Sequence, residues 1–430
     1  MQQSNSLANS ERTSHTDPAA LQQSMTTSEF EIAAQTERKP SDVPPVSKKM
    51  RPRVASIDLL RGTVMVVMAL DHTREFFSKN SINPRDVTDP ALFLTRWITH
   101  FCAPVFILLA GVAAYLYGAR NRSGGELSRF LQTRGLWLIF VELIVVRLGF
   151  SFSLDLNLFV AQVIWALGAS MIVLSVLIHL PRWAIAFIAL VMIGSHNLFD
   201  GISGDQLGAL GWIWHVLHQP GLVQVGPSAR LFVLYPLVPW VGVMAAGYAL
   251  GPLFELEQDA RRRWFATLGI VTLAGFIALR ASNLYGDPQP WSMQSSWLPT
   301  LLSFVNCEKY PPSLLYLAMT LGPAFLFLAL FERARGKVAA FIITYGRVPF
   351  IYYVAHIFLI HAAAVVLAWI QCGTASFLFR HGPGARPATY GLSLAGVYVV
   401  WLLVVVALYP LCRWFADLKQ RRSDWWLSYL

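Results

Sequence analysis

The sequence contains few charged residues. Asp, Glu, Lys and Arg make up 13% of its 430 residues, whereas 55% are hydrophobic and the mean hydropathy is +0.49. A typical soluble domain carries about 25% charged residues, so this composition excludes an ordinary soluble protein and indicates repeated crossing of a lipid bilayer. The net charge of +10 comes from short basic runs between apolar stretches. Such runs are typical of orientation signals in membranes, so we expect no nucleic-acid partner.

Cysteine is also scarce. The four cysteines, Cys102, Cys307, Cys372 and Cys412, show neither a CxxC pair nor a Cys/His ligand spacing, so we expect no metal centre. A disulfide between Cys307 and Cys372 stays open, because both are expected near the outer face. The sequence also lacks a GxSxG elbow, a P-loop and a Rossmann fingerprint in a strand-to-helix context. Serine hydrolases, nucleoside triphosphatases and dinucleotide enzymes therefore have little support.

The first 52 residues lack apolar periodicity. They are rich in Ser, Thr, Gln, Glu and Pro, which predicts a disordered cytoplasmic tail over 1–52 and a transmembrane domain over 53–430. No basic stretch followed by an apolar core opens the chain, so we expect no cleaved signal peptide.

The apolar runs predict an all-α bundle of about ten transmembrane helices. The predicted spans are 56–77, 91–117, 135–152, 158–180, 183–198, 231–254, 265–284, 313–331, 338–370 with a break at 345–349, and 390–411. The basic clusters all fall on one side of this arrangement, which predicts that both termini are cytoplasmic. A long segment around Trp212 and Trp214 is expected to cap the outer face.

The first predicted span carries ionisable residues that a passive anchor would avoid, because a charge in hydrocarbon costs several kcal/mol. Helical spacing places five of its residues on a single stripe. The stripe consists of Asp58, Arg61, Met65, Met68 and His72. Arg61 and His72 would lie about 16 Å apart along the axis, a spacing suited to the two ends of a long substrate. Alternatively, Asp58 and Arg61 merely neutralise each other while His72 packs against a neighbour, which leaves Asp71 unexplained.

The second span places Arg96 and His100 on one helical face, with His100 at about the depth of His72. Two imidazoles at one depth, with Asp71 beside one of them, favour a proton-handling site, because imidazole exchanges protons near neutral pH. The alternative for His100 is a hydrogen-bonded packing residue.

Two further regions are candidates for ligand contacts. Arg347 stands at the Gly and Pro break of the ninth span, and His356 follows further out. Such a break either lines a ligand site or is a kink needed for packing. Lys309 and Tyr310 stand at the outer entrance of the eighth span, where they either grip an acceptor or anchor the chain at the interface.

Several segments together are similar to one known family. They are SIDLLRGTVMVVMALDH, RWITHFCAPVFILLAG, YPLVPWVGVMAAGYALG, KYPPSLLYLAMTLGPA, YGRVPFIYYVAHIFLIH and DWWLSYL. The chain from residue 53 to 430 resembles bacterial proteins of the heparan-alpha-glucosaminide N-acetyltransferase-like family. The resemblance implies a bacterial inner-membrane acyltransferase that passes an acetyl group from cytoplasmic acetyl-CoA to an extracytoplasmic glycan or amino sugar.

Residue roles follow from combining this resemblance with the stripe. His72 is expected to be the general base, oriented by Asp71 or by a group of the second span, with His100 as the second candidate. Cofactor contacts are expected from Arg61, Asp58 and Arg347. Acceptor contacts are expected from Arg96, Lys309, Tyr310 and His356.

The chain departs from the lysosomal member of the family at one point. There, the position that matches His72 resembles an Asn and the catalytic His follows in the next outer loop, whereas the loop 79–83 has no His. A proton-coupled transporter is the alternative function, although the two halves show no convincing inverted repeat. Formation of a homodimer stays open.

Overall fold

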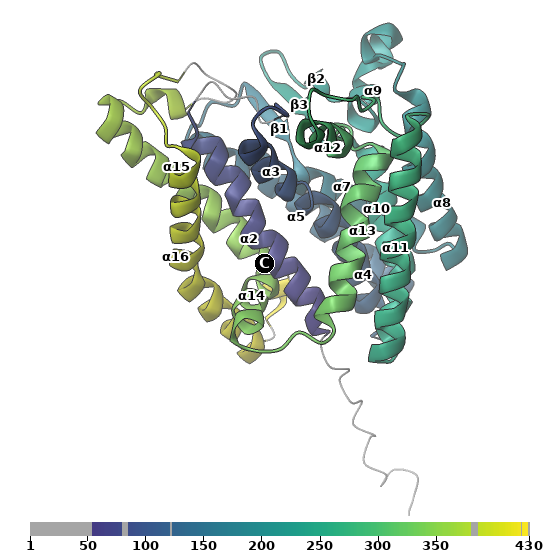
Figure 1. Cartoon of the computed structure of the whole chain (residues 1–430). Helices are drawn as coiled ribbons and strands as arrows, with labels where there is room; N and C mark the ends of the chain where they lie inside the picture. Colours follow the sequence, from purple (N-terminus) through teal and green to yellow (C-terminus); the bar gives the residue numbers. More distant parts are fainter. Residues whose placement is uncertain (1–53, 80–84, 121–122, 380–385, 423, 429–430) are drawn as a thin grey trace, which may run out of the picture. The chain divides into compact units, whose positions relative to one another are not determined.

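The computed structural model describes residues 54–79, 85–120, 123–379, 386–422 and 424–428. The predicted tail over 1–52 lies outside these residues. The described chain is mostly helical, and the elements follow one another from α2 to α16 with one small sheet (Figure 1).

The helix α2, Ala55–Phe77, is the element around which the others pack. Its neighbours are α4 (Cys102–Gly118), α13 (Leu314–Phe331), α14 (Lys337–Arg347), α15 (Pro349–Cys372) and α16 (Leu394–Arg421). Figure 1 shows α2 in purple with α16 on one side and α13 on the other. Gly62 of α2 lies against the backbone of Ile342, and Gly346 lies against the backbone of Asp58. The missing side chains of Gly62 and Gly346 thus allow α14 to approach α2 closely, and the predicted break lies at Val348, between α14 and α15.

Seven helices are long and apolar enough to cross a membrane within the described residues. They are Pro90–Gly118, Arg182–Phe199, Leu237–Glu255, Gln258–Ser282, Leu314–Phe331, Pro349–Cys372 and Leu394–Arg421. The 23-residue α2 is of similar length, but its charged residues are spread along it, so that each stretch of 18 residues contains more than two of them. The first of the seven comprises α3 (Pro90–Thr99) and α4, which meet at His100 and Phe101.

The all-α prediction was wrong in one respect, because two predicted spans begin as strands. The strand β1 is Leu158–Ala161 and precedes α7 (Val163–Leu177), and β3 is Arg230–Val233 and precedes α10 (Leu237–Leu250). With β2 (Gly221–Gln224) they form a sheet of order β1-β3-β2, parallel between β1 and β3 and antiparallel between β3 and β2. A strand of four mostly apolar residues is too short to show a periodicity of its own, so the hydropathy pattern joined each strand to the helix that follows it.

The third predicted span is interrupted by a wider helical turn. The helix α5, Gly124–Phe140, continues through a π-helical turn at Val141–Val146 into α6, Arg147–Ser151. Such turns are frequent at functional sites. The remaining elements are α8 (Arg182–Ser195), α9 (Gly211–Leu217), α11 (Gln258–Ser282), α12 (Trp297–Val305) and short 3-10 turns at His196–Phe199, Gly204–Leu210, Gly251–Glu255, Ser376–Leu378 and Trp425–Ser428.

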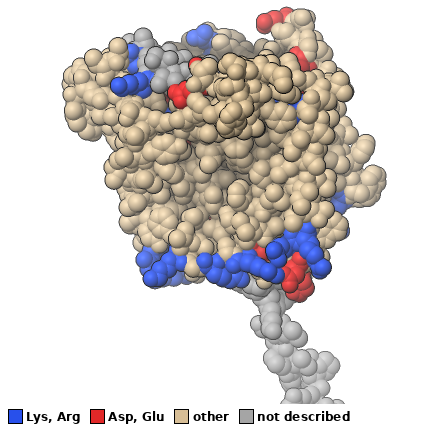
Figure 2. Space-filling model, viewed as in Figure 1, with Lys and Arg blue, Asp and Glu red and all other residues tan. Residues whose placement is uncertain are grey.

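The starts of α2 and α11 meet the end of α13, and we call this the basic end. There, the Glu332 carboxylate accepts a hydrogen bond from Ser56 Oγ at 2.6 Å and pairs with the guanidinium of Arg261. Exposed basic residues surround this contact, among them Arg262, Arg263, Arg333, Arg335 and Lys337. Figure 2 shows Lys and Arg in a band at one end of the helices, beside a wide surface almost free of charge.

All four cysteines fall within the described residues and are free thiols. The structure therefore contains no bond between Cys307, which is buried, and Cys372, which is partly exposed.

Candidate functional site

The end of α2 that lies away from the basic end opens on a cavity of about 720 Å³, which we call the large cavity. Met68 and His72 of α2 line it, and the small sheet forms part of its wall. Alternate strand residues face it, Leu158 and Val160 from β1 and Arg230 and Phe232 from β3, as the two-residue period of a strand requires. The parallel register pairs Leu158 with Arg230 and Val160 with Phe232, so both strands present these residues to the same side.

The lining of the large cavity is rich in cations. Its basic residues are Arg74, Arg96, Arg147, Arg230, Lys309 and Arg386, and its acidic residues are Asp71, Glu75 and Glu142. Two of the acids have partners inside the protein. The carboxylate of Asp71 accepts a hydrogen bond from Arg74 at 2.8 Å. Oε2 of Glu142, in the π-helical turn, accepts from the first backbone N–H groups of α7 at 2.9 and 3.1 Å. The cavity therefore carries an excess of positive charge.

Lys309 is buried at 7% exposure, and no carboxylate of the described residues lies within ion-pair distance of its ammonium group. Arg96 is partly buried and likewise has no ion pair among these residues. Burial alone would lower the pKa of Lys309, but the oxygens of the neighbouring Tyr310 and Asp71 raise it above its usual value. A buried cation without a counter-ion is costly, so these two groups favour an anionic ligand in the cavity.

His72 forms a pair with His356 of α15. His72 Nδ1 and His356 Nε2 are 2.7 Å apart, and the ring planes differ by 11°. His356 Nδ1 donates to the carbonyl oxygen of Tyr352 at 2.9 Å, because a carbonyl can only accept. The fully buried His356 ring is neutral in this arrangement, so its Nε2 accepts from His72 Nδ1–H. The lone pair of His72 Nε2 is thereby left for a group in the large cavity.

A second cavity, of about 240 Å³, lies between α2, α4, α5, α7 and the start of α15, and we call it the small cavity. Apolar side chains form most of its lining, and its basic residues are Arg61 and Arg134. Arg61 donates to the Asp58 carboxylate at 2.9 Å, and Asp58 itself is buried. The neutralised pair expected as the alternative reading of α2 is therefore present, and Arg61 also lines a cavity.

The two cavities share part of their walls. Phe106 of α4, Val163 of α7 and Tyr353 of α15 line both of them. The stripe predicted on α2 runs along this pair of cavities. Arg61 and Met65 line the small cavity, and Met68 and His72 line the large cavity.

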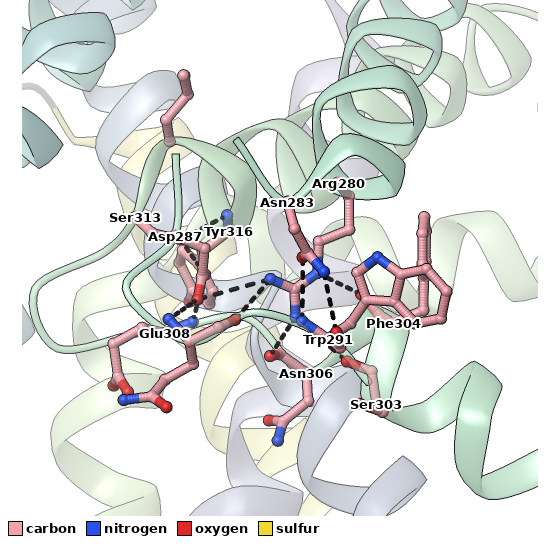
Figure 3. A network of polar contacts seen from close by, with 12 residues as sticks. Arg280, Asn283, Asp287, Trp291, Ser303, Phe304, Asn306, Glu308, Ser313 and Tyr316 are labelled. Atoms are coloured by element: carbon pink, nitrogen blue, oxygen red, sulfur yellow. Dashed lines mark hydrogen bonds and ion pairs between the residues drawn. The ribbon is translucent and has the colours of Figure 1, made fainter. Parts of the chain in front are cut away.

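The loop between α11 and α13 brings Lys309 and Tyr310 to the large cavity. Figure 3 shows the polar contacts of Arg280, Asp287 and Glu308 in this loop. The buried Arg280 guanidinium at the end of α11 donates to the carbonyl oxygens of Gln289, Ser303, Phe304 and Asn306. Asp287 lies 3.7 Å from it and accepts from Ser313 Oγ at 2.6 Å and from the Glu308 N–H at 2.9 Å. These bonds satisfy the backbone of an irregular loop and fix its course.

Glu308 links this loop to the segment after α2. Its carboxylate receives two hydrogen bonds from the Arg85 guanidinium, at 2.6 and 2.9 Å, and also accepts from the N–H groups of Lys309 and Tyr310. Burial would raise the pKa of Glu308, but the Arg85 bonds hold it below its usual value. The charged Glu308 therefore fixes the backbone from which Lys309 projects.

Three of the other predicted residues, His100, Arg347 and His356, line neither cavity. His100 is 2% exposed, and both its ring nitrogens lack a hydrogen-bond partner within the described residues. Arg347 is exposed at the end of α14 and lines neither cavity. His356, expected to contact the acceptor, lies behind His72. Asp71, expected to orient His72, is hydrogen bonded to Arg74.

The charged lining residues that sequence reasoning missed include Glu142, Arg147, Arg230 and Arg386. Glu142 had a signal, because a lone acid inside an apolar span is costly unless it is used or paired. The sequence signal for the three arginines was weaker. Arg147 stands in an apolar run, but its neighbours in the sequence do not indicate the sheet that it reaches through the carbonyl of Leu158 at 3.1 Å.

Comparison with protein families gives a match to the family described as "Heparan-alpha-glucosaminide N-acetyltransferase, catalytic" over residues 53–282. This stretch is more than half of the 430 residues and runs from before α2 to the end of α11. It includes Arg61, His72 and Glu142, whereas Lys309 and His356 follow it. No curated protein matches the chain.

Proposed function

The chain belongs to the heparan-alpha-glucosaminide N-acetyltransferase catalytic family and is a membrane acetyltransferase, and from this premise we propose that it carries acetyl groups across the membrane. Acetyl-CoA binds from the cytoplasm at the small cavity, and an extracytoplasmic sugar accepts the acetyl group in the large cavity. The observation that supports this most strongly is the stripe on α2, which lines both cavities, with Arg61 in the small one and His72 in the large one.

The membrane arrangement follows from the same proposal. The seven apolar helices, together with α2, the segment 124–151 and α7, make ten spans with both termini in the cytoplasm. The basic end faces the cytoplasm, in agreement with the excess of Lys and Arg there. In a bacterial cell this is the inner membrane.

The small cavity suits the donor. The pantetheine arm of acetyl-CoA is long, thin and uncharged, and the lining around Phe106 and Tyr353 is largely apolar. The phosphates of the nucleotide meet Arg61 and Arg134 at the basic side, since guanidinium groups bind phosphate well. Asp58 holds Arg61 in place. The exposed Arg347 adds positive charge two residues before Pro349, which lines this cavity.

The large cavity suits a polar acceptor. Arg96 and Lys309 provide positive charge, and Tyr310, which is next to Lys309 in the lining, provides an aromatic face for a sugar ring. An acceptor that carries a carboxylate, sulfate or phosphate near its reacting hydroxyl or amine would supply the counter-ion that Lys309 lacks within the described residues. A neutral sugar would leave that charge uncompensated.

His72 is the general base of the proposed reaction. Its Nε2 takes the proton of the acceptor hydroxyl or amine while the acceptor oxygen or nitrogen attacks the acetyl carbonyl carbon. The C–S bond then breaks, and the proton passes from the imidazolium to the CoA thiolate. His356 fixes the tautomer of His72, and the carboxylate of the adjacent Asp71 favours the imidazolium that forms.

Sealed vesicles containing the purified protein test this function. Radiolabelled acetyl-CoA is supplied outside and an amino sugar is trapped inside, so that only transfer across the membrane labels the sugar. We expect labelled sugar in intact vesicles. Labelling that requires both substrates on one side would contradict the transmembrane route. No labelling with any of a set of neutral and acidic sugars, together with solute-dependent proton flux in the absence of CoA, would favour a transporter instead.

A further inference from the structure

The wall shared by the two cavities contains a single hydrogen-bond donor on a side chain. Phe106 and Val163 carry no polar side-chain atom, whereas Tyr353 carries a hydroxyl. If the pantetheine arm fills the small cavity and the acceptor fills the large one, the thioester carbonyl lies at this wall. The carbonyl oxygen becomes negatively charged during the attack and requires a donor there.

Tyr353 is well placed beside the proposed base. It stands three residues before His356 on α15, and its ring centroid lies 6.3 Å from that of His72, with the planes at 78°. Its ring is 4% exposed, so the side chain is held in place by its surroundings. The hydroxyl has no hydrogen-bond partner within the described residues, and its oxygen is not fully buried. It therefore has access to cavity space.

Two other donors near the wall are already engaged. Thr99 Oγ1 donates to the carbonyl oxygen of Arg96 at 2.7 Å, and Cys102 Sγ donates to that of Val64 at 3.3 Å. Both residues line the large cavity but not the small one.

We propose that the Tyr353 hydroxyl donates a hydrogen bond to the oxygen of the acetyl carbonyl and stabilises the tetrahedral intermediate. The inference rests on the proposed acetyl transfer. As the acceptor bonds to the carbonyl carbon, the C=O electron pair moves onto oxygen and is held by Tyr353 O–H. As the C–S bond breaks, the pair returns to re-form C=O. Tyr353 keeps its proton throughout, so His72 alone carries the proton from acceptor to thiolate.

The neighbouring tyrosine provides a matched control. Tyr352 is fully buried, its hydroxyl lacks a partner, and it lines neither cavity. Its contribution to the His72 and His356 pair is its backbone carbonyl, which a phenylalanine retains. Tyr352→Phe and Tyr353→Phe thus remove the same atom from adjacent residues of one helix.

The test measures acetyl transfer from acetyl-CoA to an amino sugar by the full-length protein. We expect Tyr353→Phe to lower kcat about 100-fold with an unchanged KM for acetyl-CoA, because the lost bond forms only in the transition state. Tyr352→Phe should stay within about threefold of the parent. Equal activities of the two variants would overturn the inference while leaving the transferase function intact. A parent protein without transfer would instead contradict the function itself.

A second substitution keeps the test decisive if Tyr353→Phe fails to fold. Replacement of Tyr353 by a difluorinated tyrosine preserves its shape and gives a more acidic phenol. A more acidic phenol is a stronger hydrogen-bond donor to the oxygen that becomes negative, so we expect kcat to rise severalfold with an unchanged KM for acetyl-CoA. A kcat equal to that of the parent would overturn the proposal.

Discussion

The two cavities differ in chemistry although the same helices build them. Both are lined by α2, α4, α7 and α15, yet the large cavity collects six cations and three acids, whereas the small one has two arginines among apolar side chains. Along α2 the change occurs between Met65 and Met68, about one helical turn apart. One stripe of a helix thus serves two environments.

This difference in lining determines which substrate each cavity favours. An apolar passage favours a flexible acyl carrier and disfavours a sugar, whose hydroxyl groups would lose water without gaining hydrogen bonds. A cavity rich in charge favours the sugar and disfavours the carrier. In the proposed reaction, each substrate is therefore directed to its own cavity, and the acetyl group is the part that reaches the shared wall. The predictions below separate the two cavities experimentally.

The largest effect is expected from the base. His72→Gln should lower acetyl transfer about 1000-fold, because general-base catalysis is lost while both cavities keep their shape. His100→Gln is the control, since His100 lines neither cavity. Transfer rates at saturating acetyl-CoA check the prediction. A larger loss in the His100 variant than in the His72 variant would assign the base to His100.

Loss of Arg280 should destabilise the large cavity. Arg280→Ala leaves four backbone carbonyls without their donor and the buried Asp287 carboxylate without its ion-pair partner, which costs about 3 kcal/mol. We expect a lower melting temperature and weaker acceptor binding, with acetyl-CoA binding nearly unchanged. Calorimetry with each substrate separates these effects. Equal losses for both substrates would mean that the two cavities are not independent.

A smaller effect is expected from Lys309. Lys309→Met removes the charge but keeps an apolar stem of similar length, so KM for an acidic acceptor should rise about tenfold, which corresponds to about 1.4 kcal/mol. KM for acetyl-CoA should not change. The exposed Lys79 supplies the control variant Lys79→Met. If Lys309→Met bound acidic and neutral sugars as well as the parent does, the proposed charge selection would be wrong.

The smallest effect is a pH dependence of the loop. Arg85 lowers the pKa of Glu308 in the folded protein. The charged Glu308 therefore stabilises the fold fully above its usual pKa of 4.5, and this stabilisation is lost as pH falls through the lower pKa of the folded protein. We expect acceptor affinity to fall below pH 4.5, and to fall further in the parent than in the Glu308→Gln variant. Isothermal titration at several pH values measures this. Parallel curves for the two proteins would exclude Glu308 as the cause.

Patterns within one segment predicted much of the molecule. The stripe predicted on α2 placed Arg61 and His72 on one helical face, because helical period alone decides which side chains share a face, and these two residues line the two adjoining cavities. Hydropathy located the apolar helices, and the family resemblance is confirmed by the match over 53–282. Local charge spacing also gave the pair between Asp58 and Arg61.

Contacts between distant segments were not predictable in this way. His72 and His356 are 284 positions apart, and only the packing of α15 on α2 brings them together. The sheet joins segments near residues 158, 221 and 230, and its pairing carries Arg230 into the cavity. The partner of Glu142 is the start of α7, which hydropathy had absorbed into a longer span.

A density map of the protein with a non-hydrolysable acetyl-CoA analogue tests most directly whether the two cavities form one route. We predict the pantetheine arm in the small cavity, phosphates near Arg61, and the acyl carbonyl between Tyr353 and His72. An analogue bound with its acyl group away from the shared wall, or a wall that stays closed around it, would contradict the route.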